Sequence, residues 1–206
     1  MEFHQLSLGQ LQTNCYIVAH NNRALIFDPG EEADRVIHFL TQHNYTPIAI
    51  LLTHGHFDHI GAVDQLRDYY QIPVSIHQLE ANWLSDPHLN SSSIFPLGDV
   101  IIKPADQTIE LGETEIEAFK FNVIHTPGHS PGGVSFIFDS EATIISGDCL
   151  FQSGIGRTDL VGGNQADLYD SIMKLYQLPD HYRVLSGHGP STTIGYETQT
   201  NPFIRA

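Results

Sequence analysis

The sequence predicts an α+β fold in which two β-sheets pack face to face, with helices on the outside. Short apolar segments of strand type and amphipathic segments of helix type both recur along the 206 residues. They fall into two halves, and each half has strands followed by a helix. The length and the 41% hydrophobic content suffice for one substantial core. A single domain over residues 1–206 is therefore expected.

The first half opens with predicted strands. Segments 15–19 and 24–27 have strand composition, and the turn signal Asp28-Pro29-Gly30 follows the second strand directly. From residue 33 to residue 43 the apolar side chains recur at helical spacing, which predicts the first helix. The continuous apolar run 48–53 is typical of a strand buried on both faces.

After this buried strand, helices and strands alternate. Helices are predicted over about residues 60–70 and 78–84, with a strand at 73–76 between them. Residues 86–103 contain Pro, Ser, Asn and Gly without clear periodicity, which predicts a long loop or lid.

The second half is again rich in predicted β-structure. Gly-rich turns separate its strand-like segments, which are residues 108–111, 116–124, 134–138 and 143–146. A helix is predicted over 166–177, because Leu168, Ile172 and Leu175 fall on one stripe, and a last strand over 182–186.

The charge and the cysteine content exclude some functions. Nine basic residues stand against 24 acidic ones, and this formal net charge of −15 argues against a nucleic-acid partner. Two cysteines are too few for a disulfide framework, which favours a reducing, cytoplasmic location. No signal peptide and no membrane-spanning run are apparent, so no membrane partner is expected.

Four potential metal ligands follow the buried strand. Thirteen histidines are unusual for this length, and neutral imidazole is the commonest metal ligand among side chains. If the backbone is extended, His54, His56 and Asp58 project to one side, and His59 approaches from another direction. The alternative is a set of polar residues on a surface loop, which this dense pattern disfavours.

Three more candidates also follow predicted strands. His129, Asp148 and His188 are each flanked by Gly or Pro, which permit tight turns at the end of a strand. Together with the first cluster they make seven potential ligands. A single catalytic zinc takes about three protein ligands, so the sequence indicates two metal ions.

The chain resembles the metallo-β-lactamase superfamily, and within it the short glyoxalase II-like branch. Five motifs carry the resemblance: Thr53-His54-Gly55-His56-Phe57-Asp58-His59, Asp28-Pro29-Gly30, Pro127-Gly128-His129-Ser130, Gly147-Asp148-Cys149-Leu150-Phe151 and Gly187-His188-Gly189-Pro190. The family implies a four-layer αββα sandwich with the metals at one edge of its sheets. It also implies that His54, His56 and His129 bind one metal, that Asp58, His59 and His188 bind the other, and that Asp148 bridges them.

Other positions separate the branches of the family. Diiron flavoprotein relatives carry Glu in place of His56, and many β-lactamases carry Cys in place of Asp148. Cys149 is beside the ligand and is interpreted as a small buried residue. Asp28 is expected to support the ligand loop from outside, with an ordinary turn residue as the alternative. Arg157 is expected either to bind a substrate carboxylate or to pair with a neighbour such as Asp159.

The resemblance implies a hydrolase for S-(hydroxyacyl)glutathione-like thioesters, which are small anionic substrates. Two divalent cations, zinc first with iron or manganese as alternatives, lower the pKa of a shared water and polarise the bond that it attacks. Asp58 is the predicted catalytic residue, because it can both bind a metal and orient that water. The helical C-terminal domain that binds glutathione in typical glyoxalase II is expected to be absent.

Three other functions stay open. A persulfide dioxygenase resembles this chain but uses one iron, held by the equivalents of His54, His129 and Asp148. A lactonase of the same fold is a second alternative. The third is a binding module without activity, in which the metals serve folding, although structural sites usually close with about four ligands.

Overall fold

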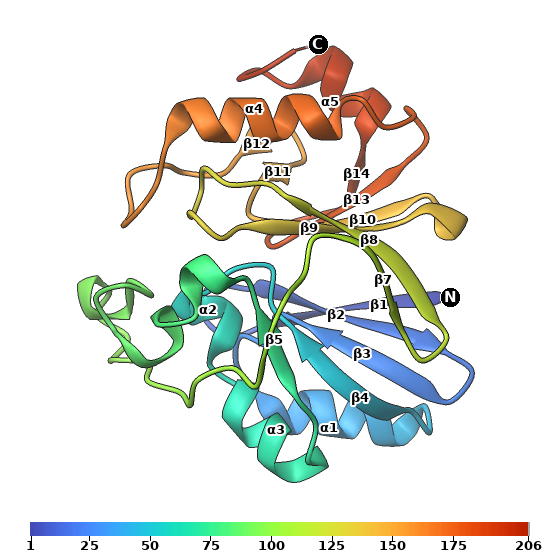
Figure 1. The fold of residues 1–206 in the computed structure, drawn as a ribbon, viewed down its shortest axis with the longest axis vertical. Helices are drawn as coiled ribbons and strands as arrows, with labels where there is room; N and C mark the ends of the chain where they lie inside the picture. The colour runs from blue at the N-terminus through green and yellow to red at the C-terminus, as the bar shows by residue number, and fades with distance from the viewer. Residues whose placement is uncertain (206) are drawn as a thin grey trace. The chain divides into compact units, whose positions relative to one another are not determined.

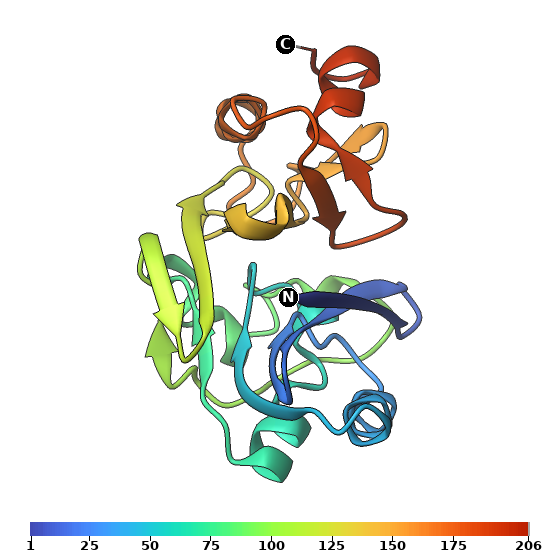
Figure 2. The same cartoon turned by 90° about the vertical axis from the view of Figure 1, so that its right-hand side faces the viewer.

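The computed structural model of the protein describes residues 1–205. The chain forms two compact units, residues 1–109 and the residues from Glu110 onward. Each unit contains one six-stranded sheet. Figure 1 colours the first unit blue to green and the second unit yellow to red, and Figure 2 shows both from the side. Among the described residues, no helix is long and apolar enough to span a bilayer.

The sheet of the first unit has the strand order β1-β2-β3-β4-β5-β6. Its first three strands are antiparallel neighbours, and the pairs from β3 to β6 are parallel. The carboxyl ends of parallel strands lie along one edge of a sheet, where ligand-bearing loops commonly start. The strands are β1 (Glu2–Leu8), β2 (Thr13–His20), β3 (Arg23–Phe27), β4 (Thr46–Leu51), β5 (Val74–Ile76) and β6 (Gln107–Thr108).

Helices α1 (Ala33–Gln42) and α3 (Val63–Tyr70) cover one face of this sheet, as Figures 1 and 2 show. Val36 and Leu40 of α1 are fully buried in one apolar cluster with strand residues such as Ile17 and Ile26. The helical periodicity predicted for 33–43 is therefore confirmed. It identifies the face that packs on the sheet.

The helix predicted over residues 60–70 is interrupted. A short helix, α2 (Phe57–Ile60), precedes α3, and Gly61 and Ala62 separate them. A Cβ atom on Gly61 would lie 2.3 Å from the carbonyl oxygen of Gly30, so the Asp28-Pro29-Gly30 turn approaches too closely for any side chain there. The sequence pattern did not reveal this contact, because it joins segments distant in the chain.

Two further predictions in this unit are corrected. The helix expected over 78–84 is a pair of 3₁₀ turns, Gln78–Glu80 and Trp83–Ser85. The buried strand begins at Thr46, earlier than expected, and Pro47 is accommodated at a shift of register beside Ala24.

The segment 86–103 is irregular apart from a 3₁₀ turn at Ser92–Ile94, as predicted. It is attached to the first unit by the buried side chain of Asn90. The Asn90 amide donates to the carbonyl oxygens of Trp83 and Val100, at 3.1 and 2.9 Å. The backbone N–H of Phe57 donates to the Asn90 carbonyl at 3.0 Å, which fixes the segment to the start of α2.

The sheet of the second unit has the order β14-β13-β10-β9-β8-β7. The single strand predicted over 116–124 is wrong, because the chain turns near Glu117, at φ 50°, and forms the hairpin of β7 and β8. The strands are β7 (Gly112–Ile116), β8 (Phe119–His125), β9 (Val134–Phe138), β10 (Thr143–Gly147), β13 (Arg183–Ser186) and β14 (Thr192–Thr193), with a separate hairpin of β11 (Leu150–Phe151) and β12 (Gly154–Ile155).

Helix α4 (Gln165–Leu175) packs on one face of the second sheet. Leu168, Ile172 and Leu175 share an apolar cluster with Ile144 and Val184. The predicted stripe is therefore confirmed. The sequence pattern does not indicate β1, the β11–β12 hairpin, β14 or the last helix, α5 (Ile194–Thr200), because each is short or weakly periodic.

Candidate metal centre

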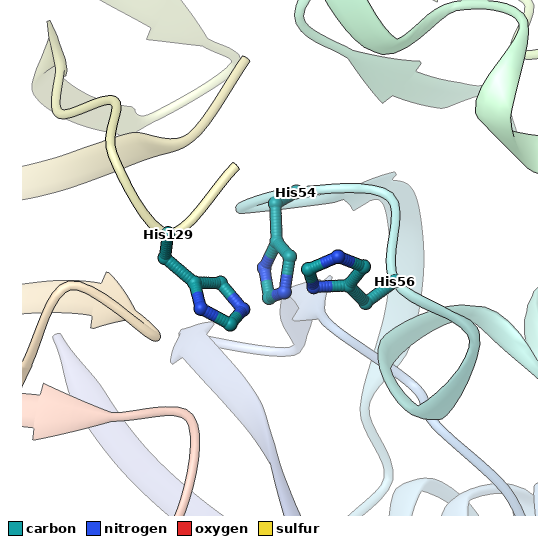
Figure 3. A group of neighbouring side chains, drawn as sticks. All are labelled: His54, His56 and His129. Atoms are coloured by element: carbon teal, nitrogen blue, oxygen red, sulfur yellow. The ribbon is translucent and has the colours of Figure 1, made fainter. Parts of the chain in front are cut away.

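The first ligand cluster lies in the loop after β4 and in the first turn of α2. We define it as His54, His56, Asp58 and His59. All three histidines are buried, each with at most 3% of its surface exposed. The His54 ring centroid lies 4.8 Å from that of His56 and 4.2 Å from that of His59. Figure 3 draws His54 and His56 as sticks, together with His129 of the second unit.

The local backbone differs from the extended chain assumed for this motif. His56 is extended and caps the N-terminus of α2, while Asp58 and His59 are already helical. Asp58 Oδ2 lies 3.7 Å from His59 Nε2 and accepts a hydrogen bond from Thr13 Oγ1 at 2.9 Å. The helical turn thus brings Asp58 to His59, so the reason given for Asp58 from alternation along a strand was wrong.

Asp28 organises this cluster through three hydrogen bonds. Its carboxylate is buried and accepts from the backbone N–H of Thr53 at 2.8 Å and from Thr53 Oγ1 at 2.6 Å. It also contacts His59 Nδ1 at 3.0 Å. Thr53 Oγ1 in turn lies 3.0 Å from His54 Nδ1. Because the Thr53 hydroxyl donates to Asp28, its oxygen accepts from His54.

These contacts fix the protonation pattern of two imidazoles. His54 and His59 both place their Nδ1–H toward an oxygen, so Nε2 is the nitrogen with a lone pair for a metal. Asp28, His54 and His59 have potential ligand atoms within 4.8 Å of one another. The Asp28 carboxylate accepts from Thr53 and faces His59 Nδ1, which is the arrangement that outer carboxylates have beside metal-bound histidines.

Close backbone packing holds the ligand loop. A Cβ atom on Gly30 would lie 1.9 Å from the Asp58 carbonyl oxygen, so only glycine fits this turn. The buried carboxylate of Glu80 accepts from the backbone N–H of Gly55 at 2.5 Å. Glu80 therefore fixes the residue between the first two histidines.

The second ligand cluster consists of His129, Asp148 and His188, all in the second unit. His129 follows β8, Asp148 follows β10 and His188 follows β13. Asp148 Oδ2 lies 3.5 Å from His129 Nε2 and 3.6 Å from His188 Nε2. The carboxylate is thus placed between two imidazole nitrogens.

His129 repeats the pattern seen in the first cluster. Its Nδ1 lies 2.8 Å from the carbonyl oxygen of Arg157, so Nε2 again is the nitrogen for a metal. Gly156, which precedes Arg157, packs against both ligands. A Cβ atom there would lie 2.0 Å from the Asp148 carbonyl oxygen and 3.1 Å from His129 Cβ.

The Arg157 side chain pairs with Asp159, one of the two arrangements expected from the sequence. Arg157 donates from Nε and from a terminal guanidinium nitrogen to the two Asp159 oxygens, at 2.6 and 2.7 Å. These hydrogen bonds lower the pKa of Asp159 to about 2. Cys149 is buried as interpreted, and its burial raises the pKa of its thiol to about 12. A neutral thiol is a poor ligand and a poor nucleophile.

Several groups that contact the candidate ligands are not apparent from the sequence. Thr53 is only part of the histidine motif there, and Glu80 falls in the predicted helix 78–84, where the structure has 3₁₀ turns. The Arg157 carbonyl carries no side-chain signal at all. For Thr53, a hydroxyl directly before the first histidine was the available signal; for Glu80 and Arg157, the contacts depend on the tertiary fold.

The comparison with protein families identifies the group to which this geometry belongs. The sequence model of the metallo-beta-lactamase superfamily matches residues 8–188. The chain belongs to this superfamily. The match runs through both units and contains all seven predicted ligands, so the resemblance stated from the motifs is confirmed.

Two curated relatives are similar over nearly their whole lengths. The chain is 48% identical to "Probable metallo-hydrolase YqgX" of Bacillus subtilis (strain 168), over 99% of this chain and 98% of the relative. It is 34% identical to "Hydroxyacylglutathione hydrolase GloC" of Haemophilus influenzae, over 100% of this chain and 99% of the relative. The family therefore includes metallo-hydrolases similar to this chain throughout.

Two solved structures are similar in the same way. The crystal structure of BLEG-1 B3 metallo-beta-lactamase has a TM-score of 0.95 and 50% sequence identity. The match covers 98% of this chain and 99% of that chain. The crystal structure of TTHA1623 in a di-iron-bound form has a TM-score of 0.88 and 39% sequence identity. The match covers 98% of this chain and 100% of that chain. These likenesses confirm the predicted α+β metallo-β-lactamase fold.

Proposed function

We propose that this protein is a dinuclear metal-dependent hydrolase that acts on thioesters of the S-(hydroxyacyl)glutathione type. One observation carries the metal-binding part of the proposal. Three buried or largely buried histidines, His54, His59 and His129, each present Nδ1 to an oxygen within 3.0 Å. Ligating histidines in proteins almost always have such an outer partner.

The donor set fits two divalent cations. In this proposal His54, His56 and His129 hold one ion, Asp58, His59 and His188 hold the other, and Asp148 is shared. Family membership supports this division, and the contacts of Asp58 with His59 and of Asp148 with His129 and His188 support it within each unit. Imidazole and carboxylate ligands suit zinc, iron and manganese, and the similar TTHA1623 structure is described as di-iron-bound.

The chain's own residues then orient the reaction. A bound metal pair supplies a water of lowered pKa and polarises the carbonyl under attack. Asp58, which accepts a hydrogen bond from Thr13, would orient the attacking water in this proposal. Asp28 and the Arg157 carbonyl each face Nδ1 of their histidine, so that in the neutral ring Nε2 carries the lone pair that a metal would take.

The thioester substrate rests on the likeness to the Haemophilus hydroxyacylglutathione hydrolase. A thiolate leaves with little help from a general acid, which suits a site whose nearby groups are metal ligands and their carboxylate partners. Arg157 is the proposed contact for a substrate carboxylate. Its pairing with Asp159 leaves one of its two terminal guanidinium nitrogens for that contact.

β-Lactam hydrolysis is the second candidate, because a structure described as a B3 metallo-beta-lactamase is 50% identical over nearly the whole chain. The same metal pair would polarise a lactam carbonyl. A lactam nitrogen, however, requires protonation as it leaves. The two candidates therefore differ in their need for a proton donor.

A substrate comparison tests the proposal. The zinc-, iron- and manganese-loaded proteins are each assayed with S-lactoylglutathione, a cephalosporin and a simple lactone, beside the Asp58→Ala variant. We expect the highest kcat/KM for the thioester and a loss of about 100-fold or more in the variant, since removing a group that orients the nucleophile has effects of that order. Faster hydrolysis of the lactam would favour the second candidate. One iron per chain with sulfur-dependent oxygen uptake would favour the dioxygenase instead.

A further inference from the structure

Helix α5 carries a buried carboxylate, Glu197, that belongs to neither ligand cluster. Its side chain has no exposed surface. Its two oxygens accept from the backbone N–H of Ser153 at 3.0 and 3.1 Å, from Thr192 Oγ1 at 2.6 Å and from Asn201 Nδ2 at 2.8 Å. A buried carboxylate is costly unless it is satisfied by hydrogen bonds, and this one has three donor groups.

The donors belong to segments that carry metal-ligand candidates. Ser153 lies in the turn of the β11–β12 hairpin, which follows Asp148 directly. Thr192 begins β14, just after the loop that contains His188. Glu197 therefore joins the chain that leaves Asp148 to the chain that leaves His188.

The hairpin turn is also held from a second direction. Asn201 Nδ2, besides donating to Glu197, donates to the carbonyl oxygen of Gly154 at 3.1 Å. Ser153 has a φ of 55°, in the left-handed region that non-glycine residues rarely adopt. Two hydrogen-bonded side chains thus fix a turn whose backbone conformation is unfavourable by itself.

The β11–β12 hairpin connects the contacts of Glu197 with those of His129. Its second strand, β12, runs into Gly156 and Arg157. Gly156 packs against the Asp148 backbone, and the Arg157 carbonyl lies 2.8 Å from His129 Nδ1. The hairpin turn is therefore linked through β12 to the carbonyl that faces His129 Nδ1.

We propose that Glu197 is a positioning residue for the second ligand cluster. By holding the hairpin turn and the start of β14, it sets the separations among His129, Asp148 and His188. The proposal rests on the proposed function, because the cluster matters only if it binds metal. An apolar residue at this position would attach α5 to the buried cluster that contains Ile194, but it would leave the Ser153 N–H and the Asn201 amide without their carboxylate.

The test compares the metal affinity of three variants with that of the wild-type chain. Glu197→Ala removes the acceptor, whereas Glu197→Gln keeps one oxygen for Ser153 and Asn201 and turns its amide toward the Thr192 hydroxyl. Leu175→Ala is the matched control, because it removes buried volume from α4 without a hydrogen bond to any ligand segment. Zinc affinity is measured by chelator competition on folded protein, and the visible spectrum of the cobalt-loaded protein reports the ligand geometry.

We expect Glu197→Ala to weaken zinc binding by about 10-fold or more, as the loss of outer-shell support does in other metal sites, and to shift the cobalt spectrum. Glu197→Gln should stay within about threefold of the wild type, since it retains most of the hydrogen bonds. Leu175→Ala should lower the melting temperature without changing affinity or spectrum. If Glu197→Ala fails to fold, Thr192→Val, which removes only one donor, takes its place with an expected loss of about threefold.

Unchanged affinity and spectrum in Glu197→Ala, or in Thr192→Val where that replaces it, would overturn the proposal. An equal loss of affinity in Leu175→Ala would also do so, because the effect would then come from lower stability alone. A wild-type chain that binds no metal would instead refute the proposed function. The stoichiometry of the wild type thus separates the two failures.

Discussion

Replacement of Asp28 by asparagine should weaken metal binding although it changes only one atom. Asparagine tolerates the left-handed backbone found at Asp28, where φ is 48°. Its oxygen can replace the carboxylate oxygen that accepts from the Thr53 N–H. Its amide must then face Thr53 Oγ1 and His59 Nδ1, which both donate to the carboxylate in the wild type.

The expected loss of metal affinity follows from the two imidazoles, His54 and His59, whose proton positions the amide of the Asp28→Asn variant would change. The amide would turn the Thr53 hydroxyl toward His54 Nδ1 and would oppose the N–H of His59, so both rings would shift their protons to Nε2. A hydrogen bond to a charged group contributes about 1.5–3 kcal/mol, and about 1.4 kcal/mol corresponds to a factor of ten. We expect metal affinity to fall by about 10- to 100-fold, the usual effect of changing an outer partner.

The assay is chelator competition for zinc at neutral pH, with Asp34→Asn as the control. Asp34 is exposed on α1, and its substitution changes the net charge by the same amount. The control should bind zinc as the wild type does. Affinity within about twofold of the wild type in Asp28→Asn would refute the assignment of the proton positions.

Three further predictions concern the second unit. Gly156→Ala should reduce bound metal by about 10-fold or more, because its Cβ would meet the Asp148 carbonyl oxygen at 2.0 Å. Elemental analysis measures the bound metal. The control is Gly154→Ala, whose Cβ would meet nothing closer than 3.5 Å and which should bind as much metal as the wild type. Cys149 should resist thiol reagents at pH 8 until the protein unfolds, since burial raises its pKa to about 12; rapid labelling of the folded protein would contradict this. Pairing with Arg157 lowers the pKa of Asp159 to about 2 from an ordinary value of 3.8, so the ion pair should persist above about pH 4 and be lost as the pH falls through 2. In the Arg157→Ala variant, titration by NMR should show that the Asp159 pKa returns toward 3.8. An unchanged Asp159 pKa in this variant would exclude Arg157 as the cause.

The sequence pattern predicted the helices and strands whose apolar residues follow a regular periodicity. The stripes of α1 and α4 and the strand Val134–Phe138 were all found, because amphipathic periodicity reports which side of an element is buried. The seven ligand candidates could be proposed because they follow predicted strands in segments that contain Gly or Pro. In each case the deciding information lies within about ten consecutive residues.

The missing features depend on contacts between distant segments. The Gly30 carbonyl lies against Gly61, and the Gly55 N–H donates to the Glu80 carboxylate. In the turn between β7 and β8, Glu117 adopts the left-handed backbone conformation that glycine usually marks in a sequence. Helix α5 is held by the polar network of Glu197 and not by a long apolar stripe, so periodicity gave little indication of it.

A crystal structure of the metal-loaded protein, with anomalous data collected at the metal edges, would show whether the two ligand clusters hold a dinuclear centre. We expect two metal ions in each chain. Nε2 of His54, Nε2 of His129 and a ring nitrogen of His56 should contact one ion, and Asp58, His59 and His188 the other, with Asp148 bound to both. A single ion, or two ions that leave Asp58 and His59 uncoordinated, would contradict the dinuclear hydrolase.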